Sequence, residues 1–483
     1  MEPSPVAVPH VLVLPIPLQG HINSMLKLSE LISLAGFHVT FLNTEHIHRL
    51  LLHFTNVTSR FARWPGFHFA TIPDGLPFDH PRSGPGLVEL FDSLKITSIP
   101  LLREMLVSNR WGSDVRPPVT CIIADGIMSF TIDVARDLNI PTIFFRTVSA
   151  CSFWAYFCVP KLIEAGEIPF RDADMDCPIT CVPGMENFLR RADLPGSCRT
   201  NNLGDRTLQF LVTETINTTR ASALILNTFE DLEGPILCQI RSHCPRLYTI
   251  GPLHALLKTQ ISDSSPSVSS NSLWEENKSC IRWLDSKPLR SVVYVSFGSL
   301  ATMTRDEVLE FWHGLVNSGK PFLWVIRPDL LARKEGEDQI LTELVEGTRE
   351  RAYIVEWAPQ EEVLAHPAVG GFLTHSGWNS TLESIYAGVP MICWPYFADQ
   401  QINSRFVSEV WKLGLDMKDT CDRLKVELMV KEVMERKRDE MIKSAENMAK
   451  LARMSVGEGG SSSCNLDKLI QDIRSMCVRA SST

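Results

Sequence analysis

The sequence predicts an α/β protein with two domains, each built around a mainly parallel sheet. At 483 residues the chain exceeds what one hydrophobic core usually holds, and 44% of its residues are hydrophobic, which suffices for two cores. Short buried strands alternate with helical segments in both halves, which is the pattern that produces parallel sheets. A serine-rich stretch at 261–272 lies near the boundary between the halves and has little apolar area to bury.

The first half opens with a strand, a loop, a helix and a second strand. Val11–Leu14 is a buried apolar run, Ile22–Ala35 has helical character and ends at Gly36, and Val39–Leu42 is the second strand. Ligands of such βαβ units bind at the carboxyl ends of the strands. His21 lies between the first strand and the helix, where it can act as a general base. A single histidine near a helix start is also a common polar loop residue.

A later strand places a carboxylate at the same edge of the predicted sheet. The run PVTCIIA at 118–124 is apolar and ends at Asp125. A carboxylate hydrogen-bonded to the far imidazole nitrogen of His21 would fix the tautomer of the ring and stabilise the imidazolium. The alternative is that Asp125 caps the helix expected near 131–138.

The next strand leads into polar residues and then an aromatic stripe. Thr142–Phe145 is a buried apolar run, and we expect Arg146 and Thr147 to reach the cleft edge after it. Aromatic residues then recur at helical spacing, which is typical of a core helix and also occurs in apolar ligand pockets. These aromatic residues are Phe153, Trp154 and Phe157.

The second half begins another α/β unit. Val292–Phe297 is its first strand, and Gly298 and Ser299 follow, a pair that lets a backbone approach a phosphate but also occurs in ordinary turns. A strand-like run at 321–327 and a helix near 401–413 continue the alternation. No GxGxxG fingerprint accompanies these elements, which argues against a nicotinamide or flavin enzyme.

The stretch 357–400 contains a strand, a tight loop and a helix. The apolar run 371–374 is the strand, His375-Ser-Gly breaks it, and 379–387 suits a helix. The unpaired N–H groups of the first helical turn, together with the helix dipole, favour a diphosphate there without a metal. Upstream, Trp357 offers a flat face on which a base can stack.

Composition and charge exclude several classes of protein. The formal net charge is −9 and no long basic run occurs, so binding of nucleic acid or anionic membrane is not expected. The 13 cysteines include no CxxC pair, which favours reduced thiols. The N-terminus lacks the features of a signal peptide or membrane span, so we expect a cytoplasmic protein without a transmembrane segment.

Two clusters of polar residues raise the question of a metal site. The acidic cluster lies in a polar loop without a leading strand, and no cysteine or carboxylate spacing completes a zinc set around the histidines. We therefore expect no metal. The clusters are Asp172, Asp174 and Asp176, and His46, His48 and His53.

The stretch 357–400 resembles, over its whole length, the signature box of the plant secondary-product glycosyltransferases, which transfer sugar from UDP-sugars to small lipophilic acceptors. The opening motif PIPLQGHINSM is also similar to that family, as are 183–195 and 221–233. The resemblance implies the GT-B architecture, in which two Rossmann-like domains with parallel sheets face each other across a cleft. The domains expected are an acceptor-binding domain at 1–250, a linker at 251–280, a UDP-sugar domain at 281–460 and a helix at 461–483 that returns to the first domain.

The resemblance also implies roles for individual residues. The catalytic residues are His21, which takes the acceptor proton, and Asp125. Trp357 stacks on uracil, while Gln360 and Glu383 take the ribose hydroxyls, although Ser380-Thr-Leu-Glu383 is also a capping box. The donor-binding residues expected are Ser299, Trp357, Ala358, Gln360, His375, Trp378, Asn379, Ser380, Glu383, Asp399, Gln400 and Thr147. The acceptor pocket expected includes Phe130, Phe153, Trp154, Phe157 and Phe397.

Within this donor set, His375, Asn379 and Ser380 are expected to hold the diphosphate. Asp399 and Gln400 are expected to contact the sugar, and a final glutamine accompanies glucose donors in many members of the family. We therefore expect UDP-glucose as co-substrate and no separate cofactor.

Together these features predict an inverting, monomeric, UDP-glucose-dependent glucosyltransferase acting on a hydroxyl or carboxyl oxygen of a lipophilic terpenoid, iridoid or phenolic. The stretches 55–67 and 77–84 resemble the iridoid-glucosylating branch. The alternatives are a non-catalytic UDP-sugar-binding protein, which would not need His21 and Asp125, and a nucleotide-sugar epimerase of similar fold. Product mass with and without an added aglycone separates the epimerase from the transferase.

Overall fold

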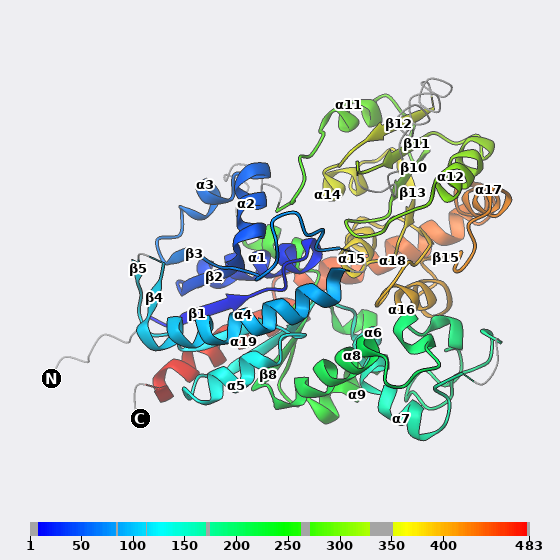
Figure 1. Ribbon diagram of the computed structural model, residues 1–483. Coiled ribbons are helices and arrows are strands. Elements are labelled where there is room, and N and C mark those ends of the chain that lie inside the picture. Colours follow the sequence, from blue (N-terminus) through cyan, green and yellow to red (C-terminus); the bar gives the residue numbers. More distant parts are fainter. Residues whose placement is uncertain are drawn as a thin grey trace.

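The computed structural model describes residues 8–83, 86–112, 114–170, 174–261, 271–328 and 351–480, and these residues form two lobes with one large parallel sheet each (Figure 1). Most of the predicted serine-rich stretch and Asp172 lie outside the described residues. The α/β class with two parallel sheets, predicted from the alternation of strands and helices, is confirmed.

The first lobe contains a seven-stranded sheet in the order β3-β2-β1-β6-β7-β8-β9, and every pairing in it is parallel. Successive side chains of β1 point to opposite faces of the sheet, and both faces are covered. Val11 and Val13 pack in one apolar cluster, while Leu12 and Leu14 pack in another. The strands are β1 (His10–Leu14), β2 (His38–Thr44), β3 (Phe67–Ile72), β6 (Cys121–Asp125), β7 (Thr142–Arg146), β8 (Ala223–Leu226) and β9 (Leu247–Thr249). A small antiparallel pair is formed by β4 (Arg110–Trp111) and β5 (Asp114–Val115).

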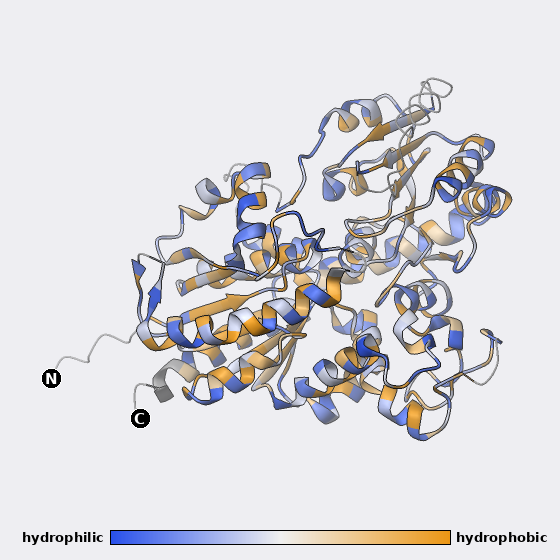
Figure 2. Cartoon of the chain, in the orientation of Figure 1, coloured by the Kyte–Doolittle hydropathy of each residue, from blue (hydrophilic) through white to orange (hydrophobic). Residues whose placement is uncertain are grey.

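The second lobe contains a six-stranded parallel sheet in the order β12-β11-β10-β13-β14-β15. Figure 2 shows the hydrophobic colouring of the strands in both lobes and the mixed faces of the surrounding helices. The strands are β10 (Val292–Ser296), β11 (Phe322–Val325), β12 (Ala352–Val355), β13 (Val369–Thr374), β14 (Met391–Cys393) and β15 (Gly414–Asp416).

Helices connect and cover the strands of both sheets. In the first half they are α1 (Gln19–Leu34), α2 (Glu45–Phe54), α3 (Val57–Phe61), α4 (Leu87–Ser108), α5 (Phe130–Arg136), α6 (Ala150–Phe157), α7 (Val159–Glu164), α8 (Arg206–Ile216), α9 (Glu230–His243) and α10 (Leu253–Gln260). In the second half they are α11 (Ser279–Asp285), α12 (Arg305–Asn317), α14 (Gln360–Leu364), α15 (Trp378–Ala387), α16 (Gln400–Arg405), α17 (Arg423–Lys431), α18 (Arg438–Val456) and α19 (Ser461–Ala480). Among the described helices, none combines the length and the apolar character needed to cross a bilayer.

The range 251–280, expected as a linker, is partly built into the first lobe. Helix α10 packs against α1, and Leu253, Leu256 and Leu257 are buried in the apolar cluster of the first sheet. The C-terminal helix α19 contacts β9 and β6 of the same sheet, with Leu466 and Leu469 buried. Both ends of the second lobe are thus attached to the first.

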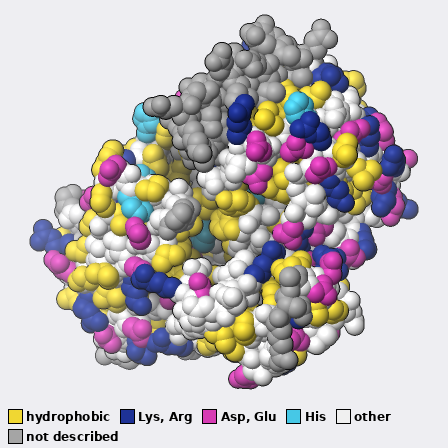
Figure 3. Space-filling view, turned by 45° about the vertical axis from the view of Figure 1, so that its right-hand side comes forward, with side chains coloured by type: hydrophobic (Ala, Val, Ile, Leu, Met, Phe, Trp, Pro, Cys, Tyr) yellow, Lys and Arg dark blue, Asp and Glu magenta, His cyan; other side chains and the backbone are white. Residues whose placement is uncertain are grey.

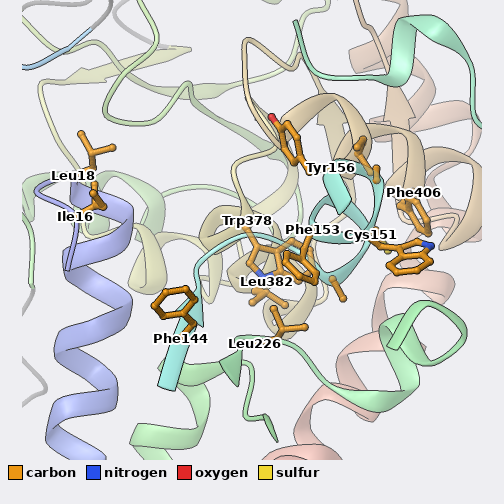
Figure 4. Close-up of a cluster of buried hydrophobic side chains, with 14 of the residues drawn as sticks. Ile16, Leu18, Phe144, Cys151, Phe153, Tyr156, Leu226, Trp378, Leu382 and Phe406 are labelled. Carbon is orange, nitrogen blue, oxygen red and sulfur yellow. The ribbon is translucent and has the colours of Figure 1, made fainter. Parts of the chain in front are cut away.

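An apolar cluster continues from one lobe into the other. Figure 4 shows Phe153 of α6 beside Trp378 and Leu382 of α15. The Trp378 indole N–H donates to the backbone oxygen of Asn227 at 2.8 Å. The two lobes are therefore packed against each other through one shared apolar cluster.

Candidate active site

A cavity of about 620 Å³ lies between the two lobes, and Figure 3 shows the surface hollowed at this place. Its lining includes the segments that follow β1 and β7 in the first lobe and β10, β12, β13 and β14 in the second. Carboxyl ends of parallel strands are where ligands of α/β sheets bind. The cavity is therefore the candidate active site.

His21 and Asp125 meet at the first-lobe side of this cavity. Asp125 is the last residue of β6, and β6 pairs directly with β1, which leads into α1. The His21 Nδ1 lies 2.5 Å from Asp125 Oδ2, and the hydroxyl of Thr147, just after β7, lies 2.9 Å from the same nitrogen. His21 is in the first turn of α1, because the helix begins at Gln19 rather than at Ile22. With Nδ1 engaged, Nε2 is the ring nitrogen that remains for a substrate.

The capping role considered for Asp125 does not occur. Helix α5 begins at Phe130 after Ser129, and Asp125 instead accepts from the backbone N–H of Ile127 at 3.3 Å and contacts His21. The Asp125 side chain is 2% exposed, whereas that of His21 is 21% exposed and lines the cavity. This arrangement suits a buried carboxylate that orients an accessible base.

Arg146 does not reach the cleft edge, contrary to the expectation from sequence. Its guanidinium is buried behind the dyad, where it donates to the Gly126 oxygen at 2.8 Å and to the Thr215 hydroxyl at 3.1 Å. A Cβ on Gly126 would lie 2.0 Å from Arg146 Cδ, so glycine is required beside Asp125. Burial lowers the pKa of Arg146, although Asp125 opposes this effect. Arg146 therefore supports the turn that carries the carboxylate.

The loop after β13 holds a buried histidine between two glycines. A Cβ on either Gly298 or Gly377 would lie 2.4 Å from His375 Nε2, and Gly298 also has a φ of +73°. Burial, together with the Arg327 charge, lowers the pKa of His375 to about 4, so its ring is neutral at pH 7. The start of α15 beside this ring carries unpaired N–H groups, since its N-cap Gly377 has no capping side chain. These groups form a place for an anion.

The capping box considered for Ser380 and Glu383 is also absent. Helix α15 begins at Trp378, so Ser380 already lies inside its first turn. Both side chains accept hydrogen bonds from Gln360 Nε2, at 2.9 Å for Ser380 and 2.7 Å for Glu383. These three residues line the cavity as a connected polar group.

Asn379 connects the lobes across the cavity. Its amide nitrogen donates to the Gly20 oxygen at 2.9 Å, and its oxygen accepts from the Ser24 hydroxyl at 2.9 Å. The predicted phosphate-binding residue therefore also contacts α1, next to His21. This tertiary contact has no signature in the local sequence.

At the end of the cavity beyond Gln360, Trp357 stacks on a second tryptophan. The rings of Trp357 and Trp274 lie 6.0 Å apart at 26°. The backbone N–H of Leu273 donates to Gln19 Oε1 at 2.7 Å, which attaches this segment to α1. Trp274 is outside the cavity lining and packs against the predicted base platform, and the polar stretch before it has no periodic pattern that would predict this contact.

Near His21, the side chains of Asp399 and Gln400 line the cavity. Gln400 Oε1 accepts from the backbone N–H groups of Tyr396 and Phe397 at 2.8 and 3.0 Å, so its amide nitrogen remains as a donor. Asp399 Oδ2 accepts from Asn403 Nδ2 at 2.8 Å. Burial raises the pKa of Asp399 to about 6, although the hydrogen bond from Asn403 opposes the rise.

Most of the aromatic residues expected at the acceptor pocket lie elsewhere. Phe130, Phe153, Trp154 and Phe157 are absent from the cavity lining and pack in or against the apolar core. Phe397 does line the cavity. Aromatic residues at helical spacing are compatible with either a core-facing or a pocket-facing helix, and the aromatic side chains of α6 pack in or against the core. Apolar residues in the lining include Leu18, Val148, Leu300 and Phe397.

The remaining predicted donor residues also line the cavity, and the polar clusters have ordinary contacts. Asp176 pairs with Arg190 at 2.8 Å, and the His48 ring lies 5.5 Å from that of Phe69. Within the described ranges, no group of three or more His, Cys, Asp or Glu side chains is placed to hold a metal ion. The remaining donor residues in the lining are Ser299, Ala358, Trp378 and Thr147.

Comparison with known proteins identifies several similar chains. A family model described as UDP-glucoronosyl and UDP-glucosyl transferase matches residues 118–455. The chain is 60% identical over 473 residues to 7-deoxyloganetic acid glucosyltransferase of Catharanthus roseus, with 97% of this chain and 98% of that protein covered. It is 51% identical over 479 residues to myricetin 3-O-rhamnoside 1,2-glucosyltransferase of Crocosmia x crocosmiiflora, with 98% and 97% covered. The crystal structure of Os79 from O. sativa in complex with UDP matches with a TM-score of 0.80 at 28% identity, covering 96% of this chain and 100% of that one.

Proposed function

We propose a specific reaction for this chain, which belongs to the UDP-glucoronosyl and UDP-glucosyl transferase family: transfer of glucose from UDP-glucose to an oxygen of a small lipophilic acceptor, with inversion. Its two facing parallel-sheet domains are the GT-B architecture, so the fold prediction is confirmed. The observation that carries the proposal is the 2.5 Å contact between His21 and Asp125 at a cavity shared with the α15 N-terminus.

In the proposed step, His21 Nε2 removes the proton from the acceptor oxygen as that oxygen attacks the anomeric carbon. The new bond forms on the face opposite to the leaving group, while the bond between the sugar and the β-phosphate breaks. Asp125 stabilises the resulting imidazolium, because its carboxylate accepts from Nδ1. The developing charge on UDP falls near His375 and the unpaired N–H groups of α15.

For the donor, we propose that Trp357 stacks on uracil and that Gln360 and Glu383 take the ribose hydroxyls. His375, Asn379 and Ser380 line the same cavity and would hold the diphosphate. Asp399 and Gln400 would contact the glucosyl group, with Thr147 on the opposite wall.

Gln400→His is expected to shift donor preference from UDP-glucose toward UDP-galactose by about tenfold, the value of one hydrogen bond. The two backbone N–H groups on Oε1 fix the glutamine amide, and a rigid imidazole places its donor elsewhere. Competition between the two donors, with products separated by chromatography, measures the ratio. Gln471→His on the exposed face of α19 is the control. An unchanged donor ratio would remove Gln400 from donor selection.

For the acceptor, we propose an iridoid or a related terpenoid. The relative at 60% identity is a 7-deoxyloganetic acid glucosyltransferase, and the cavity that contains His21 also has apolar lining residues, among them Leu18, Val148, Leu300 and Phe397. A panel of iridoid, other terpenoid and phenolic aglycones with UDP-glucose, analysed by mass spectrometry, tests this choice. Release of glucose by mild base distinguishes a glucose ester from an ether glucoside.

The two alternative functions receive less support. A non-catalytic UDP-sugar-binding protein does not need a base and an orienting carboxylate at the cavity, and the relatives compared here are named as glucosyltransferases rather than epimerases. We also propose a monomer in the cytoplasm, a compartment in which the described cysteines, which are free thiols, stay reduced.

A further inference from the structure

Four charged side chains from both lobes, Lys27, Lys258, Glu361 and Glu383, line the cavity, and the proposed reaction uses only one of them, Glu383. Lys27 comes from α1 of the first lobe, and Lys258 comes from α10, which packs on α1. Glu361 comes from α14 of the second lobe. Lys27 Nζ lies 2.6 Å from one oxygen of Glu361, and Lys258 Nζ lies 2.7 Å from the other. The Glu361 carboxylate therefore joins the lobes beside the nucleotide site.

The surroundings of Glu383 are polar and mostly buried. Glu383 is 7% exposed and accepts from Gln360 Nε2 at 2.7 Å, while the Gln360 oxygen accepts from the Tyr294 hydroxyl at 3.2 Å. His254 lies nearby against Tyr386, with ring centroids 5.3 Å apart. Burial lowers the pKa of His254 to about 3, so it is neutral at pH 7. Lys27 and Lys258 therefore supply the positive charges that act on Glu383.

The charges of this network act on Glu383 in opposite directions. Burial and repulsion from the Glu361 carboxylate raise the pKa of Glu383 to about 7, and Lys27 and Lys258 oppose this rise. Burial also favours the neutral form of Glu361, but the cations around it lower its pKa well below the usual range. Two lysine charges and one Glu361 charge leave a net positive charge, which an ionised Glu383 neutralises.

We propose that Lys27 and Glu361 are positioning residues that set donor affinity, with opposite signs, by controlling the charge on Glu383. The inference rests on the proposed function, in which the Glu383 carboxylate accepts hydrogen bonds from the ribose hydroxyls. A carboxylate accepts such bonds more strongly than a neutral acid does. Donor affinity is therefore lost as pH falls through the pKa of Glu383.

The network also couples donor binding to the position of the lobes. Lys27 belongs to the same helix as His21, and it reaches Glu361 only while the lobes stay together. Separation of the lobes would withdraw this cation from the neighbourhood of Glu383. The first lobe thus contributes to donor affinity through charge as well as through the Asn379 contact.

Calorimetric titration of UDP-glucose into the full chain without acceptor, from pH 5.5 to 8.5, tests the inference. The diphosphate diester of UDP-glucose does not titrate in this range, so the midpoint reports protein groups. Lys27→Met is expected to move the midpoint upward and Glu361→Gln to move it downward, each by about half to one pH unit. Asp399 and His21 also face the donor, but they are unchanged in all variants. An analogue without ribose hydroxyls is expected to lose the dependence on Glu383.

Two further variants separate charge from packing. Lys27→Arg keeps the cation and is expected to retain the wild-type midpoint, while Lys320→Met, which removes a lysine paired with Glu435 at 2.8 Å outside the cavity, controls for loss of any lysine. Equal weakening by Lys27→Met and Glu361→Gln at every pH, with fixed midpoints, would overturn the inference. Failure of the wild-type chain to bind UDP-glucose at any pH would instead overturn the proposed function.

Discussion

His21→Ala is expected to lower kcat by about 10²- to 10⁴-fold, which is the typical contribution of a positioned general base. The imidazole lies 2.5 Å from Asp125 and contacts the cavity, so its removal eliminates the group that accepts the acceptor proton. Binding of UDP should stay close to that of the wild type, because the residues proposed to contact the uracil and ribose, Trp357, Gln360 and Glu383, come from the second lobe and are unchanged. Initial rates at saturating UDP-glucose and acceptor, together with calorimetry of UDP, measure the two effects separately.

The matched control for this change is His366→Ala. His366 also pairs with a carboxylate, Asp285, at 3.2 Å, but it does not line the cavity. Its removal is expected to leave kcat unchanged. Turnover by His21→Ala at the wild-type rate would contradict the assignment of His21 as the base, and loss of UDP binding would indicate a structural role.

Asp193→Asn is expected to lower the free energy of unfolding by about 3 kcal/mol, because it leaves several cations without their buried partner. Asp193 is 0% exposed, and its oxygens accept from Arg190 at 3.1 Å, Lys418 at 2.6 Å and Arg405 at 3.3 Å. Arg405 and Lys418 belong to the second lobe, so this carboxylate holds the lobes together. Urea unfolding and the thermal midpoint measure the loss.

The pH dependence of that effect has a definite sign. Burial opposes ionisation of Asp193, but Lys418 and Arg190 lower its pKa below the usual value. A carboxylate with a depressed pKa stabilises the folded state above its unfolded-state pKa of about 4, and this contribution is lost as pH falls. The difference between wild type and Asp193→Asn should therefore shrink in acid.

Asp133→Asn provides the comparison for Asp193→Asn. Asp133 also interacts with two arginines, Arg136 and Arg220, but it is 52% exposed. Solvent screens such pairs, so we expect a change within about 0.5 kcal/mol. Equal destabilisation by the two variants would show that Asp193 has no special role between the lobes.

Local sequence patterns predicted much of the candidate site. His21 and Asp125 follow short apolar runs, and parallel strands deliver residues at their carboxyl ends to one edge, so the pair was expected to meet. The residues of the signature box lie together because they follow one another through β13 and α15. These features depend on hydrophobic periodicity and on the order of strands and helices, and both can be recognised from consecutive residues.

Other features depend on contacts that consecutive residues do not encode. Arg146 and the aromatic stripe of α6 have patterns compatible with either a cleft or a core. The packing of α6 against α8 and α9 places the stripe in the core, and hydrogen bonds to Gly126 and Thr215 hold Arg146 there. Likewise, the pairing of Lys27 with Glu361 and the stacking of Trp274 on Trp357 join segments distant in the chain.

The sequence by itself thus indicated the two parallel sheets, the meeting of His21 with Asp125 and the loop before α15, because apolar periodicity and turn residues act over short stretches. Only the tertiary structure decided that Lys27 pairs with Glu361, that the aromatic residues of α6 pack in the core instead of lining the cavity, and how the lobes are joined. Those outcomes depend on the relative placement of two folded lobes, and that placement results from summed packing and charge pairing over both surfaces rather than from any local pattern.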